Sequence, residues 1–173
     1  MSKIAVSMLA FLRTGEFGPI KLGISRAELQ GCLGVPENWG PYPKAKIHAS
    51  IWKYGDIEFH FHFKEDTLVG IFTDHVKTLN GGNAINLDSW VMSGSLTVKQ
   101  ALRDLEDAGM PCERIDWKFD DSTERFRVGA GIDLMFWDET QSSSNEDNLP
   151  RLAPADMTFN GFSYTISAQQ VTP

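Results

Sequence analysis

Three polar side chains that commonly bind metals recur at every second position of one predicted strand. Glu58, His60 and His62 alternate with apolar residues between positions 57 and 63, a pattern that predicts a half-buried β-strand. Because side chains alternate between the two faces of a strand, these three would share one face.

Imidazole and carboxylate groups arranged in this way could hold zinc or copper with help from a second strand. The alternative is a polar stripe facing solvent, opposite four buried residues: Ile57, Phe59, Phe61 and Phe63.

Patterns for covalent catalysis or phosphate binding do not occur in this sequence. It contains neither a Gly-x-Ser-x-Gly nucleophile motif nor a glycine-rich loop that ends in Gly-Lys-Ser/Thr. Its neighbouring carboxylates, such as Asp104, Glu106 and Asp107, are typical of charge on a helix surface. We therefore expect a protein that is not an enzyme and uses no cofactor. The alternative is a metal-binding protein or metal-dependent enzyme with His60 and His62 as ligands.

Tryptophan and tyrosine side chains suit a different function, because they bury a large area and keep a polar atom at a protein interface. Trp39 and Tyr42 lie in a loop rich in glycine and proline, and Trp137 borders a predicted strand. These three are candidate contacts for a protein partner; the alternative is that they fill the groove between sheet and helices. Trp117 and Phe119 are in phase with the apolar positions of another predicted strand, so we assign them to the core.

Charge is unevenly divided along the chain. The net charge of −7 argues against a general nucleic-acid binder, since that function needs a basic surface. Residues 1–80 carry a net +1 and residues 81–173 a net −8. This acidic excess is either a solvated surface that aids solubility or a face that attracts a basic protein. The full set of candidate partner contacts is Trp39, Tyr42, Glu58, His60, His62, Trp137, Asp138 and Glu139.

Two sequence segments, here called helix frames, each combine a capping box at the start of a helix with glycine and proline at its end. They locate the elements that would position these residues. Ser25 with Glu28, and Thr97 with Gln100, each form the spacing of a capping box, which predicts a helix start. Each helix is followed by glycine and proline, which end helices. Strands are predicted after each helix, with turns between them, at 51–54, 57–63, 68–72, 115–119, 126–128, 132–137 and 157–166.

The two frames align with each other, so the sequence predicts an internal repeat. When Ser25 is placed on Thr97, and three residues are inserted after the helix, the strand 57–61 aligns with 132–136. We expect an α+β fold in which two tandem helix-plus-strand repeats form a curved antiparallel sheet, with the helices packed on one face. The predicted segments are an N-terminal segment 1–16 that packs on the core, a first repeat 17–78, a connector 79–93, a second repeat 94–166 with an acidic loop 138–156, and a tail 167–173.

This capped helix, with Gly23 and Ser25 at its start and Leu33, Gly34 and Pro36 at its end, resembles a known repeat. It is similar to the repeat of the β-lactamase inhibitor protein and of the small outer-membrane assembly lipoproteins. The strand sequence 51–61 is also similar to small bacterial proteins associated with immunity to toxins. In the inhibitor branch the open face of the sheet and its loops bind another protein, so the resemblance implies a protein-binding function.

Two cysteines and the N-terminal residues bear on where the protein works. Cys32 and Cys112 have no zinc-ligand spacing, so we expect buried thiols or one bridge between the repeats. The first twelve residues contain one lysine and a short apolar run but lack a convincing cleavage site or lipidation cysteine, so we expect a cytoplasmic protein that binds no membrane.

The function that the sequence favours is non-enzymatic binding of another protein. We expect an inhibitor or immunity-type protein that binds a basic toxin or enzyme, itself a monomer or weak homodimer. Besides the metal hypothesis, the remaining alternative is a structural or assembly protein that self-associates through an exposed sheet edge.

Overall fold

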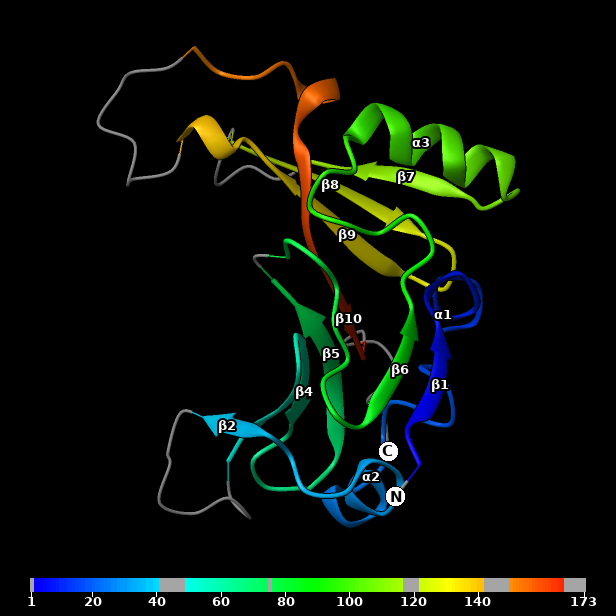
Figure 1. Cartoon of the computed structure of the whole chain (residues 1–173), viewed down its shortest axis with the longest axis vertical. Helices are drawn as coiled ribbons and strands as arrows, with labels where there is room; N and C mark the ends of the chain where they lie inside the picture. The colour runs from blue at the N-terminus through cyan, green and yellow to red at the C-terminus, as the bar shows by residue number, and fades with distance from the viewer. Residues whose placement is uncertain (1, 41–48, 75, 117–121, 142–149, 167–173) are drawn as a thin grey trace.

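The computed structural model describes residues 2–40, 49–74, 76–116, 122–141 and 150–166. Over these residues the fold is α+β, with three α-helices and a large antiparallel sheet (Figure 1). The helices are α1 (Met8–Thr14), α2 (Arg26–Leu33) and α3 (Val98–Asp107). The strands are β1 (Ile4–Ser7), β2 (Asn38–Gly40), β3 (Ile51–Tyr54), β4 (Ile57–Phe61), β5 (Leu68–Thr73), β6 (Ile85–Asp88), β7 (Cys112–Ile115), β8 (Thr123–Val128), β9 (Ile132–Trp137) and β10 (Thr158–Thr165).

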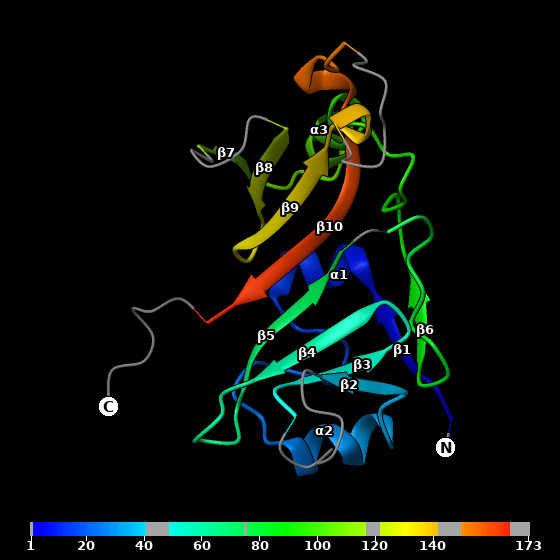
Figure 2. The same cartoon turned by 90° about the vertical axis from the view of Figure 1, so that its left-hand side faces the viewer.

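Eight strands form the main sheet in the order β2-β3-β4-β5-β10-β9-β8-β7. Every neighbouring pair is antiparallel, and β5 pairs with β10 at the centre. The first half of the sheet, β2 to β5, follows α2 in the chain, and the second half, β7 to β10, follows α3. Each half is thus a run of sequential antiparallel strands whose last member lies at the centre of the sheet (Figure 2).

Both predicted capping boxes are present and fix the starts of α2 and α3. The Ser25 hydroxyl accepts from the Glu28 amide while the Glu28 carboxylate accepts from the Ser25 amide, and Thr97 and Gln100 exchange the same bonds. Each cap residue also forms a β-bridge next to the start of a central strand, Ser25 with Thr67 and Thr97 with Thr158. The helix starts are therefore tied to β5 and β10, the strands that join the two halves.

A β-bulge interrupts each central strand where it pairs with its own half. His60 faces Gly70 while Phe61 faces Leu68, so Val69 is the extra residue in β5. In β10 the extra residue is Asn160, because Met135 faces Gly161 while Phe136 faces Phe159. A bulge increases the local twist of a strand, and both bulges are followed by a glycine.

The N-terminal segment contributes buried residues to the hydrophobic core. Strand β1 pairs in parallel with β6, and α1 buries Met8, Phe11 and Leu12. The predicted connector 79–93 therefore contains a strand, β6, whose partner lies about 80 residues earlier in the chain. None of the described helices is long and apolar enough to cross a membrane.

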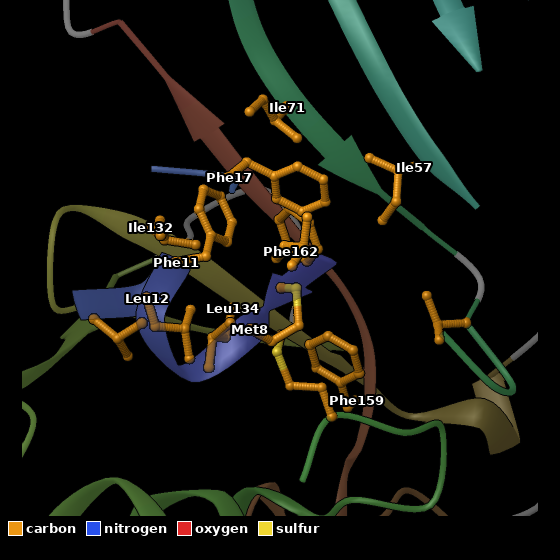
Figure 3. Packing of buried hydrophobic residues seen from close by; sticks show 14 of the residues in the cluster. Met8, Phe11, Leu12, Phe17, Ile57, Ile71, Ile132, Leu134, Phe159 and Phe162 are labelled. Atoms are coloured by element: carbon orange, nitrogen blue, oxygen red, sulfur yellow. The ribbon is translucent and has the colours of Figure 1, made fainter. Parts of the chain in front are cut away.

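One hydrophobic core extends from the first half of the sheet to the second. Phe11 on α1 makes edge-to-face contacts with Phe17 and with Phe162 of β10 (Figure 3), an arrangement that stabilises beyond simple burial. Phe63 was expected in this core, but it is 77% exposed, because β4 ends at Phe61 and Phe63 lies in the turn beyond. Trp117 and Phe119 lie outside the described residues.

Candidate functional site

The outer face of the sheet, which is the face turned away from α1, carries most of the half-exposed side chains of the strands. Residues directly opposite each other in neighbouring strands have side chains on the same face. The strand pairings from β3 to β8 therefore show which side chains lie on the outer face. Figure 2 shows β4, β5, β10 and β9 in front, with α1 behind them. Residues on the outer face include Ile51, Lys53, Glu58, His60, Phe72, Arg125, Arg127, Asp133, Met135, Trp137 and Ser163.

Glu58 lies at the centre of a small polar cluster on this face. One carboxylate oxygen accepts from Lys53 Nζ at 2.8 Å, and the other lies 2.9 Å from His60 Nε2. His60 and Glu58 are two residues apart on β4, so they share a face as the sequence predicted, and Lys53 is directly opposite Glu58 on β3.

These contacts change the acidity of the carboxyl group. The hydrogen bond from His60 is the largest cause that lowers the pKa of Glu58 to about 2, and Lys53 adds to the same effect against the cost of partial burial. In turn, the hydrogen bond between Lys53 and Glu58, together with the negative charge of Glu58, raises the pKa of Lys53. Glu58 therefore stays ionised at any pH at which the protein is expected to work.

An aromatic contact holds the His60 ring in place. The His60 ring lies against the ring of Phe72 on β5, with centroids 4.3 Å apart. Gly70 makes room for this arrangement, because a Cβ there would lie 2.3 Å from a ring carbon of Phe72. Phe72 is half-exposed beside the cluster, so an aromatic side chain lies next to a fixed ion pair at the middle of the outer face.

The second half carries a corresponding ion pair but different neighbours. Arg127 on β8 donates to both carboxylate oxygens of Asp133 on β9, at 2.8 and 3.1 Å. Met135, the residue paired with the bulge glycine of this half, accepts from Arg125 Nη2 at 3.4 Å. Opposite Phe72 on β10 the residue is the smaller Ser163.

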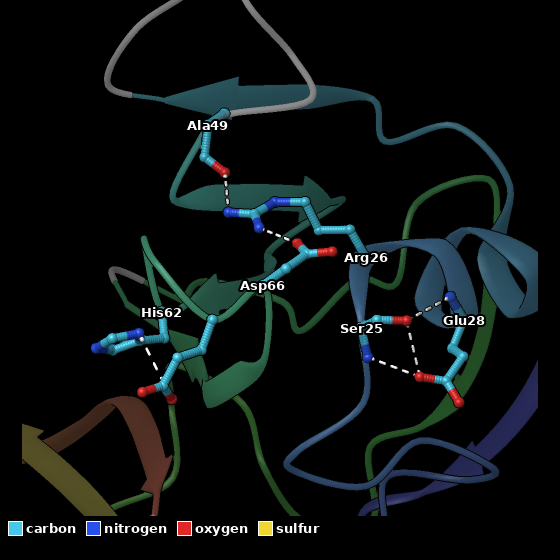
Figure 4. Close-up of polar contacts among 7 residues, drawn as sticks. Ser25, Arg26, Glu28, Ala49, His62 and Asp66 are labelled. Atoms are coloured by element: carbon cyan, nitrogen blue, oxygen red, sulfur yellow. Dashed lines mark hydrogen bonds and ion pairs between the residues drawn. The ribbon is translucent and has the colours of Figure 1, made fainter.

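His62 does not join the cluster, because it lies beyond the end of β4. It is exposed and contacts Glu65 at 3.7 Å across the turn between β4 and β5 (Figure 4). Within the described residues there is no group of three or more His, Cys, Asp or Glu side chains placed to hold a metal. His48 and His75 lie outside that part of the chain.

The same turn is fixed to α2 by a buried cation. Arg26 donates to the backbone oxygen of Ala49 at 3.0 Å, pairs with the carboxylate of Asp66, and lies over the ring of Phe61 (Figure 4). Asp66 has a φ of +52°, a conformation that costs energy for a residue with a side chain. Arg26 thus connects this turn to α2, and Phe63 is exposed on the turn. The strand pattern missed this exposed aromatic because its spacing continues the alternation of β4.

The aromatic candidates take different positions. Trp39 pairs with Trp52 on the core side of the sheet and packs, partly buried, against the hydrophobic core. Tyr42 lies outside the described residues. Trp137 ends β9 on the outer face and is half-exposed.

The acidic candidates next to Trp137 also differ from each other. Asp138 is fully buried, and its carboxylate accepts from the Thr140 amide and hydroxyl and from the Leu152 amide. Burial acts to raise the pKa of Asp138, but these hydrogen bonds together lower it. Asp138 thus shapes the loop and presents no carboxylate to solvent, whereas Glu139 is exposed.

Comparison with known proteins yields no match among family models, curated proteins or solved structures. The similarity to inhibitor and lipoprotein repeats thus remains a prediction from the sequence pattern.

Proposed function

We propose that this protein is a non-enzymatic protein-binding module whose partner contacts the outer face of the sheet. The observation that carries this proposal is the row of half-exposed apolar side chains on that face, notably Phe72, Met135 and Trp137. Aromatic residues and methionine are enriched at protein interfaces, and a rigid sheet presents them with little loss of conformational freedom on binding.

The charges on the outer face fit the same role. Lys53 is paired with Glu58, and Arg127 with Asp133. Charged groups that already have partners cost less to cover than isolated ones, so a partner can bury the apolar residues between them.

We infer a basic partner, and an inhibitor or immunity-type role, from the charge of the chain. The net charge of −7, with −8 in residues 81–173, would speed association with a positively charged protein and make that rate fall with added salt. The resemblance to the inhibitor repeat supports the same role.

We also propose that the two halves of the sheet are tandem repeats of one unit, with the helices on one face. Four features support this: the capping box before each half, the bridge from each cap to a central strand, the bulge in that strand, and the glycine after each bulge. The aligned segments 57–61 and 132–136 fall in β4 and β9, which occupy matching places in the strand order.

A cytoplasmic location is part of this proposal. Cys32 and Cys112 are both free thiols, as is usual where glutathione keeps cysteines reduced. Cys112 is exposed and Cys32 is only partly buried, so the expectation of buried thiols is wrong. Desolvation by neighbouring atoms nevertheless raises the pKa of the Cys112 thiol, which keeps it protonated and less reactive.

The proposal is tested by capturing partners from native lysate on the tagged protein, with washes from low to high salt. We expect one basic protein in stoichiometric amount that is lost as salt rises. Retention of that protein at high salt would remove the electrostatic part of the proposal, and the absence of any stoichiometric protein would remove the binding function.

A further inference from the structure

Two asparagines of this chain are each followed directly by glycine, at Asn80-Gly81 and at Asn160-Gly161. Asparagine is a chemically labile residue, and it loses its side-chain amide most readily before glycine, because glycine has no Cβ to crowd the ring that forms. Packing requires the glycine of the first pair, since a Cβ on Gly81 would lie 2.6 Å from the Cβ of Ile85. The fold therefore retains two pairs with the same intrinsic reactivity.

The reaction of such a pair needs only water. The glycine amide nitrogen gives up its proton and bonds to Cγ of the asparagine, the bond from Cγ to Nδ2 breaks, and ammonia leaves. Water then opens the cyclic imide at one of its two carbonyl carbons. Opening at Cγ gives aspartate, and opening at the backbone carbonyl gives isoaspartate, so the net change replaces an amide by a carboxylate without any oxidation or reduction.

The surroundings of the first pair permit this reaction. Asn80 is exposed, and within the part of the chain that the structure describes the Gly81 amide donates to no acceptor. The Gly82 amide donates to Asn80 Oδ1 at 2.8 Å. This bond turns the Asn80 side chain over the backbone that follows it, which brings Cγ toward the Gly81 nitrogen. The same bond draws electron density away from Cγ and stabilises the charge that develops on Oδ1 during attack.

The surroundings of the second pair prevent it. Asn160 is the extra residue of the bulge in β10, and its backbone oxygen accepts from the Val76 amide at 3.1 Å. Gly161 is buried and lies opposite Met135 on β9. Ring closure here would pull the backbone of a central strand out of its pairings. Opening of such a strand costs close to the full free energy of unfolding, whereas an exposed connection opens at little cost.

We propose that Asn80 is a site of spontaneous deamidation, at which the folded protein acquires aspartate and isoaspartate while Asn160 stays intact. The modification adds a negative charge to the connector 79–93. In the isoaspartate form it also adds a carbon atom to the main chain.

The modified residue lies where the connector joins the turn between β3 and β4. The Asn80 amide donates to Asp56 Oδ2 at 2.9 Å, and the Asn80 backbone oxygen accepts from the Asp56 amide at 2.8 Å. Glu37 supports the same joint, because its carboxylate accepts from the amides of Gly55 and Asn83. A new carboxylate at position 80 is repelled by Asp56 and Glu37, and an added main-chain carbon displaces the bonded atoms. Deamidation therefore loosens this joint.

The test incubates the full chain at mildly alkaline pH, which favours the amide anion that attacks. One sample is folded in buffer and one is unfolded in guanidinium chloride, and both pairs are followed by peptide mapping with mass spectrometry. We expect Asn80 and Asn160 to react at similar rates in the unfolded chain. In the folded protein Asn80 should react at least about tenfold faster than Asn160, because strand opening limits the second pair.

Asn80→Ser supplies the matched control, since a serine hydroxyl can still accept from the Gly82 amide but has no amide to lose. This variant should give no acidic product from the peptide that contains position 80. The proposal is overturned if Asn80 in the folded protein is as stable as Asn160, or if Asn160 reacts as fast as Asn80.

Hydrogen exchange tests the consequence for the joint. In the deamidated protein the Asp56 amide should exchange at least about fivefold faster than in the unmodified protein, as expected for a locally opened segment. The Val76 amide, which donates to Asn160, should exchange at an unchanged rate. Unchanged exchange at Asp56 would refute the loosened joint, and equally faster exchange at Val76 would show a loss of stability that is not confined to it.

Discussion

The two halves of the sheet share a framework but differ on the outer face. Gly70 and Gly161 follow equivalent bulges, and each half has a cross-strand ion pair. Yet His60 in the first half matches Met135 in the second, and Phe72 lies opposite Ser163. The shared positions include the glycines after the bulges and one ion pair in each half, whereas the differing residues named here all lie on the outer face. We infer that the outer face is where this fold acquires its function.

The largest expected difference between the halves concerns the bulge glycines. A Cβ on Gly161 would lie 2.1 Å from the backbone oxygen of Thr73, whereas on Gly70 it would meet the ring of Phe72. The Phe72 side chain can rotate to make room for a Cβ, whereas the backbone of β5 at Thr73 is held by its pairing with β10. Gly161→Ala should therefore lower the free energy of unfolding by about 3 kcal/mol and Gly70→Ala by about 1 kcal/mol, measured by urea denaturation.

A second substitution serves as control for that comparison. In a protein that already carries Phe72→Ser, adding Gly70→Ala should lower the free energy of unfolding far less than it does in wild type, because the ring atoms near the new Cβ are gone. Adding Gly161→Ala to the same protein should lower it as much as in wild type. Equal losses at the two glycines, or an undiminished loss at Gly70 in the presence of Phe72→Ser, would contradict this account of the bulges.

The connections that lead into the central strands are held by different charged residues. Arg26 pairs with Asp66 in the turn before β5, and buried Asp138 accepts from Leu152 in the segment before β10. Asp138→Ala leaves the amides of Thr140 and Leu152 without their acceptor and should cost about 2 kcal/mol in thermal or chemical unfolding. Glu139→Ala, next in sequence but exposed, should change stability by less than about 0.5 kcal/mol. Similar values for both would mean that Asp138 is not a structural residue.

Acid should weaken the first half through Glu58. Its pKa is about 2 in the folded protein against an ordinary 4.5, so its contribution is complete above pH 4.5 and is lost as pH falls toward 2. Glu58→Gln should lower stability at pH 7 by about 1–2 kcal/mol, with allowance for solvent screening. The gap between wild type and variant should close between pH 4.5 and 2; a gap that does not change with pH would refute the role of the charge.

The smallest expected effects are equal in the two halves. Ser25→Ala and Thr97→Ala each remove a helix cap of the same geometry and should each cost about 1 kcal/mol. Matched losses in unfolding experiments would strengthen the proposed repeat. A loss at only one site would show that the two helix frames are not energetically equivalent.

Local patterns predicted the parts of the fold that depend on local interactions. The capping boxes at Ser25 and Thr97 marked both helix starts, alternation located β4, and apolar runs next to glycine turns located β3 and β9. The pairing of β1 with β6 was missed, because two parallel strands about 80 residues apart leave no signal in either segment. The bulges were also missed, since an extra residue is defined only by the partner strand.

Prediction of the site was less complete than prediction of the fold. The shared face of Glu58 and His60 followed from strand periodicity, but the end of β4 removed His62 and Phe63 from that pattern. Asp138 was expected at a partner surface and is instead fully buried. Its hydrogen-bond donors lie up to 14 residues away, beyond the range of any local pattern.

The most direct test of the central claim is the affinity of the captured partner for an outer-face variant, measured by calorimetry. The variant carries Phe72→Ser and Met135→Ser, and the control carries Phe63→Ser, which removes an exposed aromatic away from the outer face. We predict that the outer-face variant loses at least about tenfold in affinity, as for interface anchors, while the control binds like wild type. Unchanged affinity in the outer-face variant, or an equal loss in the control, would contradict binding through this face.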